Sequence, residues 1–214
     1  APPATGNTND AGSGPILIGH YGSLTGSEAT FGQSTSNGLR LAIKEFNAAG
    51  GLNGRKIELK EYDTRGDAGE AKLAVERLVK SDKVVAVIGE VASKLSLAGG
   101  PVCQDAGVPM ITPSSTNPRV TAIGDYVFRV CFIDPFQGTV MSKFAISKGW
   151  KKVAILTDSK QDYSVGLTEF FKKHFTANGG TITGEQSYGS GDKDFKAQLT
   201  AIKAGAPDAI FASG

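Results

Sequence analysis

Three consecutive hydroxyl residues, Ser114, Ser115 and Thr116, stand between two prolines directly after a short apolar segment. We call these three residues the hydroxyl loop. Because Pro113 and Pro118 cannot donate a backbone hydrogen bond, neither a helix nor a central strand continues through this stretch. The pattern indicates a stiff loop at the carboxyl end of a strand, where open α/β sheets bind small ligands. An ordinary turn rich in Ser and Thr would explain the same residues.

Two further segments are expected to end strands at the same edge of the sheet, namely residues 19–26 and residues 89–93. Ser93 opens a predicted helix, and the free N–H groups and positive dipole of a helix start favour an anion. Ser93 and Thr116 could therefore hold one carboxylate together. Ser93 could equally be a simple helix N-cap.

Motifs for enzymatic chemistry are weak. Gly19, Gly22 and Gly26 lack dinucleotide-binding spacing, and there is no P-loop or nucleophile elbow. Asp63 ends the second expected strand, as the ribose-binding acid of a Rossmann fold does. However, it follows the first turn by about 40 residues, against about 20 in that fold. A Rossmann-like nucleotide-dependent enzyme that uses Asp63 is kept as an alternative.

Composition narrows the possible functions. The 214 residues are 40% hydrophobic and 21% charged, which is typical of a globular protein. The net charge is only +2 and no run of basic residues occurs, so the sequence shows no basic patch of the kind that binds nucleic acid. No apolar run approaches the ~20 residues that a membrane-spanning helix needs. Residues 1–14 contain no large apolar side chain, which predicts a flexible linker. That linker is either a disordered terminus or a spacer that tethers an exported protein to a membrane anchor.

The metal-binding and redox residues are few: His20, His174, Cys103 and Cys131. Two cysteines do not make a zinc site or a disulfide scaffold, so we expect no metal and no cofactor. Cys103 and Cys131 are either a disulfide pair or two free buried thiols.

Strand and helix patterns alternate along the chain, which predicts an α/β fold with parallel sheets and helices on both faces. The helix expected at residues 136–148 should turn Val140, Phe144 and Ala145 inward. The order strand, helix, glycine pair and strand occurs in residues 16–62 and again in residues 153–188. Two similar lobes would explain this repeat, and so would chance recurrence of a common pattern. We expect strands at residues 16–19, 56–62, 84–88, 108–111, 126–131, 153–156, 181–186 and 209–212, and helices at residues 31–49, 71–79, 93–106, 136–148, 165–175 and 195–204.

Short motifs in a characteristic order cover almost everything after Gly14. They are residues 22–26, 47–54, 62–63, 87–89, 111–118, 128–129 and 137–138, together with Asp134, Asp158, Tyr163 and Gly166. In this order they resemble the periplasmic branched-chain amino-acid (Leu/Ile/Val) binding proteins, the type I solute-binding proteins of ABC transporters.

The resemblance implies a type I periplasmic-binding-protein fold, in which two Rossmann-like lobes with parallel sheets close on a ligand. Residues 15–133 would form the N-terminal lobe, and residues 134–214 part of the second lobe. Family members are longer, so the chain resembles a C-terminally truncated member with an incomplete second lobe. An incomplete lobe would expose an apolar face and a sheet edge, which predicts a homodimer or a segment swap.

The resemblance also implies the ligand-binding residues. Ser93 and the hydroxyl loop, with Ser114 and Thr116 foremost, would hold the α-carboxylate and α-ammonium of an amino acid. Tyr163 of the second lobe would cover the ligand, and Phe31 would line the pocket for its side chain. Alternatively, Phe31 only packs its helix and Tyr163 is a surface aromatic.

The implied function is capture of an amino acid, branched-chain by default, outside the cytoplasm for the membrane permease of an ABC importer. Relatives also take other amino acids, amides and aromatic acids. Such a protein does no chemistry, and a removed N-terminal segment could have anchored it to lipid. An extracellular ligand-sensing domain of a receptor is the alternative within the same fold.

Overall fold

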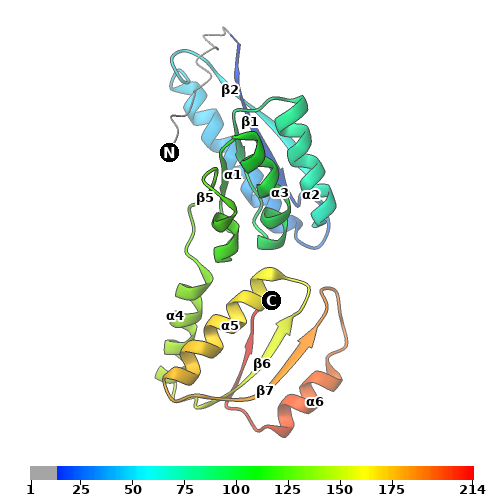
Figure 1. The fold of residues 1–214 in the computed structure, drawn as a ribbon, viewed down its shortest axis with the longest axis vertical. Coiled ribbons are helices and arrows are strands. Elements are labelled where there is room, and N and C mark those ends of the chain that lie inside the picture. The colour runs from blue at the N-terminus through cyan, green and yellow to red at the C-terminus, as the bar shows by residue number, and fades with distance from the viewer. Residues whose placement is uncertain (1–13) are drawn as a thin grey trace.

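The computed structural model describes residues 14–214, which form two lobes stacked along the long axis of the molecule (Figure 1). Each lobe is built on its own parallel sheet, and the chain crosses from the first lobe to the second between β5 and α4. Thirteen of the 14 residues expected to form a linker lie outside the described residues.

The first sheet has the strand order β2-β1-β3-β4-β5, and every neighbouring pair is parallel. All five carboxyl ends therefore point to one edge, as the βαβ pattern predicts. The strands are β1 (Ile16–Gly22), β2 (Ile57–Asp63), β3 (Ala86–Ile88), β4 (Met110–Thr112) and β5 (Val127–Arg129).

The core of the first lobe lies mainly under α2 and α3, where Tyr21, Leu78, Leu95 and Met110 are fully buried. In contrast, α1 buries only two small residues, one of which is Gly32. A Cβ on Gly32 would lie 2.1 Å from the Ser23 carbonyl oxygen, so glycine lets α1 approach the loop after β1. The helices are α1 (Ala29–Ala48), α2 (Ala68–Glu76) with a π-helical extension (Arg77–Ser81), α3 (Ser93–Ala106) and the 3-10 helix Pro118–Ile123.

The second sheet has the order β7-β6-β8, which matches the order β2-β1-β3 in the first lobe. The recurring sequence pattern thus coincides with two similar parallel strand arrangements. In its core the rings of Phe171 and Phe211 stack 3.9 Å apart, centroid to centroid. The elements are α4 (Asp134–Ser147), β6 (Lys152–Asp158), α5 (Asp162–Ala177), β7 (Thr181–Tyr188), α6 (Lys196–Ala204) and β8 (Ala209–Ala212).

One expectation about α4 is wrong. Ala145 is buried as predicted, but Val140 and Phe144 are 45% and 47% exposed. Gly138 is the reason, because a Cβ there would lie 2.8 Å from backbone atoms of α5. Close approach of the two backbones makes the small residues of α4 the buried face and leaves its large apolar residues outside.

Both cysteines are free thiols in this structure, with Cys103 buried and Cys131 half-buried. Burial raises the pKa of Cys103 to about 12, so this thiol is inert. Across residues 14–214, no helix combines the length and apolarity needed to cross a membrane.

Candidate ligand-binding site

Glu90, a buried acid two residues after the end of β3, ties together the carboxyl edge of the first sheet. Its Oε1 accepts hydrogen bonds from the hydroxyls of Ser23 (2.7 Å) and Thr64 (2.8 Å), which follow β1 and β2. Its Oε2 accepts from the N–H groups of Val91 (2.7 Å) and Ala92 (3.2 Å). Because four donors satisfy one buried charge, the three loops share a fixed geometry.

The hydroxyl loop is held from both sides. The Thr112 hydroxyl at the end of β4 donates to the Glu90 carbonyl oxygen (2.7 Å) and accepts from the Ser115 N–H (2.9 Å). From β5, Nη1 of Arg129 donates to the carbonyl oxygens of Ser115 (2.8 Å) and Asn117 (3.0 Å). The loop is therefore formed before any ligand arrives, which lowers the entropy cost of binding.

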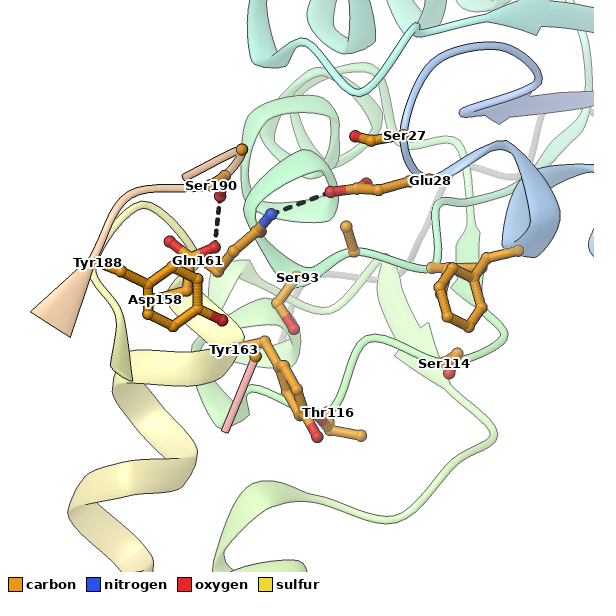
Figure 2. A pocket seen from close by; sticks show the side chains of 15 residues that line it. Ser27, Glu28, Ser93, Ser114, Thr116, Asp158, Gln161, Tyr163, Tyr188 and Ser190 are labelled. Atoms are coloured by element: carbon orange, nitrogen blue, oxygen red, sulfur yellow. Dashed lines mark hydrogen bonds between the residues drawn. The ribbon is translucent and has the colours of Figure 1, made fainter. Parts of the chain in front are cut away.

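A cavity of about 530 Å³ lies between the lobes, within the usual range for small-molecule sites. The first lobe contributes the loop before α1, the start of α3 and the hydroxyl loop. The second lobe contributes the ends of β6 and β7 and the start of α5, as Figure 2 shows. Its lining is Ser27, Glu28, Phe31, Val91, Ala92, Ser93, Ser114, Thr116, Asp158, Gln161, Tyr163, Tyr188, Ser190, Gly191 and Gly214.

Five of the six residues predicted to bind ligand line this cavity: Phe31, Ser93, Ser114, Thr116 and Tyr163. They come from α1, α3, the hydroxyl loop and α5, so the fold brings together positions far apart in the chain. Figure 2 shows Tyr163 extending towards Thr116. Contact of these side chains with a ligand stays a prediction.

Ser93 is not the N-cap of α3, because Ala92 occupies that position. Its hydroxyl instead accepts the N–H of Asn117 (3.3 Å), which joins the start of α3 to the end of the hydroxyl loop. The first backbone N–H groups of a helix have no partner within the helix. The cavity therefore has an end that favours an anion.

Ser115 does not fit its predicted role. It is fully buried and absent from the cavity lining. Its hydroxyl shares a hydrogen bond with the Ser96 hydroxyl (2.7 Å) and lies 3.1 Å from the Glu90 carbonyl oxygen. We correct the prediction: Ser115 holds the loop onto α3 and β3, and its neighbours on either side face the cavity.

Sequence reasoning missed several residues of the lining. Nε2 of Gln161 in the second lobe donates to the carboxylate of Glu28 in the first lobe (3.0 Å), and Lys94 lies 3.5 Å from the same carboxylate. Asp158, at the end of β6, accepts the Ser190 hydroxyl (2.5 Å). The sequence did offer a signal for Asp158, because this residue lies just after the end of an expected strand. Glu28 and Gln161 lie in loops, and no sequence pattern marked them as site residues.

Other polar groups near the edge are already engaged. Asp63 accepts the Thr25 hydroxyl (2.5 Å) and the N–H groups of Leu24 (2.9 Å) and Arg65 (2.9 Å). Burial opposes ionisation, but these bonds hold the pKa of Asp63 below its usual value. The acid that was considered for a nucleotide ribose thus serves to fold its own loop. Across residues 14–214, no cluster of three or more His, Cys, Asp or Glu side chains could hold a metal ion.

Two parallel-sheet lobes with a cavity between them define a class of two-lobed ligand-binding proteins. Residues 15–214 match the model of the family described as periplasmic binding protein. The chain therefore belongs to this family.

Relatives with solved structures share both sequence and fold. A leucine binding protein, LivK, from Thermotoga maritima is 43% identical with a TM-score of 0.87, over 92% of this chain and 55% of that one. LivJ from Streptococcus pneumoniae, solved in complex with isoleucine, is 36% identical with a TM-score of 0.86, over 92% and 56%. An amino acid binding protein of Pseudomonas aeruginosa is 35% identical over 93% of this chain and 54% of its own length. The chain thus spans about half the length of the curated relatives it matches.

Proposed function

We propose that this protein captures a free amino acid, with a branched-chain amino acid as the first candidate, for an ABC importer. The observation that carries the proposal is the cavity between the lobes, where the start of α3 and the hydroxyl loop meet. A helix start favours the carboxylate, and the loop offers hydroxyl and carbonyl oxygens to the ammonium. The isoleucine in the LivJ structure and the names of the relatives support the choice of ligand.

Residues 15–133 serve, in this proposal, as the lobe that recognises the head group of the ligand. Ser93, Ser114 and Thr116 bind the charged groups, Tyr163 covers the ligand and Phe31 lines its side-chain pocket. The residues from 134 onward form the part of the second lobe that closes on the ligand. Glu28 and Gln161, which both line the cavity, already join the two lobes.

The direct test is calorimetric titration of the protein with a panel of the 20 amino acids and with benzoate as an aromatic acid that lacks an ammonium. We expect micromolar or tighter binding of at least one branched-chain amino acid. Absence of heat with every amino acid would overturn the proposal, and binding of benzoate alone would replace it with an aromatic-acid carrier.

Three further features follow from the proposed role. The protein binds without altering its ligand, so it is not an enzyme. It acts outside the cytoplasm, which the family description supports, and delivers its ligand to a membrane permease. Anchoring to lipid through a removed N-terminal segment stays a prediction.

We also propose that this chain associates with a second copy through α4. Phe136, Val140 and Phe144 lie four residues apart on one side of the helix and are 60%, 45% and 47% exposed. Phe132, 55% exposed, precedes them and lies 6.1 Å from Phe136, ring to ring. A continuous apolar stripe of this kind favours association in water.

A further inference from the structure

Asp134 is a buried acid without a partner. It is the first residue of α4, it is fully buried, and neither of its carboxylate oxygens has a hydrogen-bond partner. Acids are common in the first turn of a helix, where they usually accept a backbone N–H. Asp134 accepts none, and the N-cap position belongs to Ile133. A buried carboxylate left in this state costs free energy, which indicates a missing cationic or hydrogen-bonding partner.

The surroundings of Asp134 connect it to the cavity through Thr116. The Asp134 N–H donates to the Thr116 carbonyl oxygen (3.0 Å), so the two residues are in contact. The Thr116 hydroxyl is also buried without a partner, although Thr116 itself lines the cavity. On the opposite side, a Cβ on Gly166 of α5 would lie 3.2 Å from Oδ2 of Asp134, so the helix closes that side.

The charged groups around Asp134 leave its negative charge unpaired. Arg129 is the nearby cation, but its guanidinium donates to the carbonyl oxygens of Ser115 and Asn117 and to the Thr121 hydroxyl (2.6 Å). Burial raises the pKa of Asp134, and the Thr116 hydroxyl and Arg129 oppose that rise only in part. A cation entering the cavity would stabilise the carboxylate.

The cavity thus has two ends of opposite character. The start of α3 at Ser93 favours an anion, and the unpaired carboxylate behind Thr116 favours a cation. The two ends adjoin, since the Asn117 N–H next to Thr116 donates to the Ser93 hydroxyl (3.3 Å). An α-amino acid carries a carboxylate and an ammonium on one carbon, and it therefore matches both ends at once.

We propose that Asp134 is the positioning residue for the ammonium group of the ligand and acts through Thr116. Its carboxylate accepts a hydrogen bond from the Thr116 hydroxyl, so the hydroxyl presents a lone pair to the ammonium. The negative charge behind the hydroxyl then favours a zwitterion over a plain carboxylic acid. The inference rests on the proposed function and adds the group in this chain that distinguishes an amino acid from its deaminated analogue.

The test compares wild-type protein with Asp134→Asn, which keeps the shape of the side chain and removes its charge. Each is titrated calorimetrically with the tightest-binding amino acid of the panel and with the matching acid that lacks the ammonium; for L-leucine this is 4-methylpentanoate. We expect Asp134→Asn to weaken amino-acid binding at least tenfold and to change binding of the deaminated acid less than threefold. Thr116→Val should show the same loss of preference, and the double variant should add little to it.

Binding of the deaminated acid also reports that the variant is folded. Asp125→Asn, an exposed acid before β5, serves as control and should keep the wild-type preference. Equal weakening for both ligands would make Asp134 a structural residue only, and unchanged affinity for both ligands would remove it from recognition. Either result overturns the inference. If wild-type protein binds no amino acid, the proposed function fails first and the inference fails with it.

Discussion

Glu90 holds the geometry of the site through its hydrogen bonds, although it is buried and does not line the cavity. Its carboxylate accepts two hydroxyl and two backbone hydrogen bonds, and its carbonyl oxygen accepts the Thr112 hydroxyl. Four strand ends are thereby joined through one residue. Loss of the carboxylate would leave several buried donors unsatisfied.

We predict that Glu90→Gln lowers the free energy of unfolding by about 1.5–3 kcal/mol, because an amide NH₂ would face hydroxyl or N–H donors. Urea denaturation followed by circular dichroism measures the change. Glu58→Gln, an exposed position on β2, is the matched control and should stay within about 0.5 kcal/mol of wild type. Equal stability of Glu90→Gln and wild type would contradict the role given to Glu90.

His20 is a further polar residue that is fully buried in the first lobe. Its Nδ1 lies 2.9 Å from Oε1 of Glu61, and its Nε2 is buried without a partner. Burial lowers the pKa of His20 below 6.5, although Glu61 opposes the effect. The neutral imidazole therefore donates from Nδ1 to the carboxylate.

This pKa shift predicts a sign for the pH dependence of stability. Between the folded pKa of His20 and 6.5, the unfolded chain binds more protons than the folded protein. The contribution of His20 is therefore complete above pH 6.5 and is lost as the pH falls towards the folded pKa. NMR titration of the two imidazole rings tests this directly, with His174 as internal comparison. A pKa above 6.5 for His20 would show the opposite sign.

At the scale of elements, glycines decide how closely the helices approach. Gly138 lets α4 lie against the backbone of α5, where a Cβ would meet Phe170 and Phe171 backbone atoms at 2.8 Å. Backbone atoms cannot turn aside as a side chain does. The contact also fixes the start of α4, which carries Asp134.

We predict that Gly138→Ala destabilises the protein by about 1–3 kcal/mol, because α4 must move away from α5. Gly38→Ala is the matched control, since Gly38 lies within α1 with nothing within 4 Å of an added Cβ. That change should stabilise by about 0.5–1 kcal/mol through helix propensity. Thermal unfolding of both variants is the measurement, and a shift of the same sign in both would refute the packing argument.

At the scale of the whole molecule, two lobes share one cavity and touch across it. Arg119 of the first lobe donates to the carboxylate of Asp162 in the second (3.0 Å), and the Asn117 side chain donates to the Asp162 carbonyl oxygen (2.9 Å). These contacts sit beside the hydroxyl loop. Movement of one lobe against the other would therefore change the ligand site directly.

The apolar stripe of α4 makes the oligomeric state testable at this scale. We expect wild-type chain to give a mass above that of a monomer in multi-angle light scattering at high concentration. Val140→Glu with Phe144→Glu should return it to a monomer, because charge on the stripe opposes burial. Leu199→Glu on α6, 48% exposed, is the control and should leave association unchanged. A monomeric wild-type chain would count against the interface.

The sequence alone determined the order of elements and the edge of the sheet where the site lies. Periodicity and turn residues are local, so α3 was predicted with both of its ends correct, and β8 likewise. The prolines around the hydroxyl loop and the parallel strands placed Ser114 and Thr116 at the cavity. These features depend on neighbours in the chain, which a single sequence displays.

Only the tertiary structure decided which side chains turn inward. Ser115 resembles its neighbours in sequence, but the Glu90 carbonyl oxygen and Ser96 draw its hydroxyl away from the cavity. Val140 and Phe144 look like core residues, but Gly138 brings the other face of α4 against α5. Asp134 is one of the motif residues in the sequence, but only its burial beside Thr116 reveals that its carboxylate has no partner. Each of these outcomes depends on atoms brought together from distant parts of the chain, which no local pattern encodes.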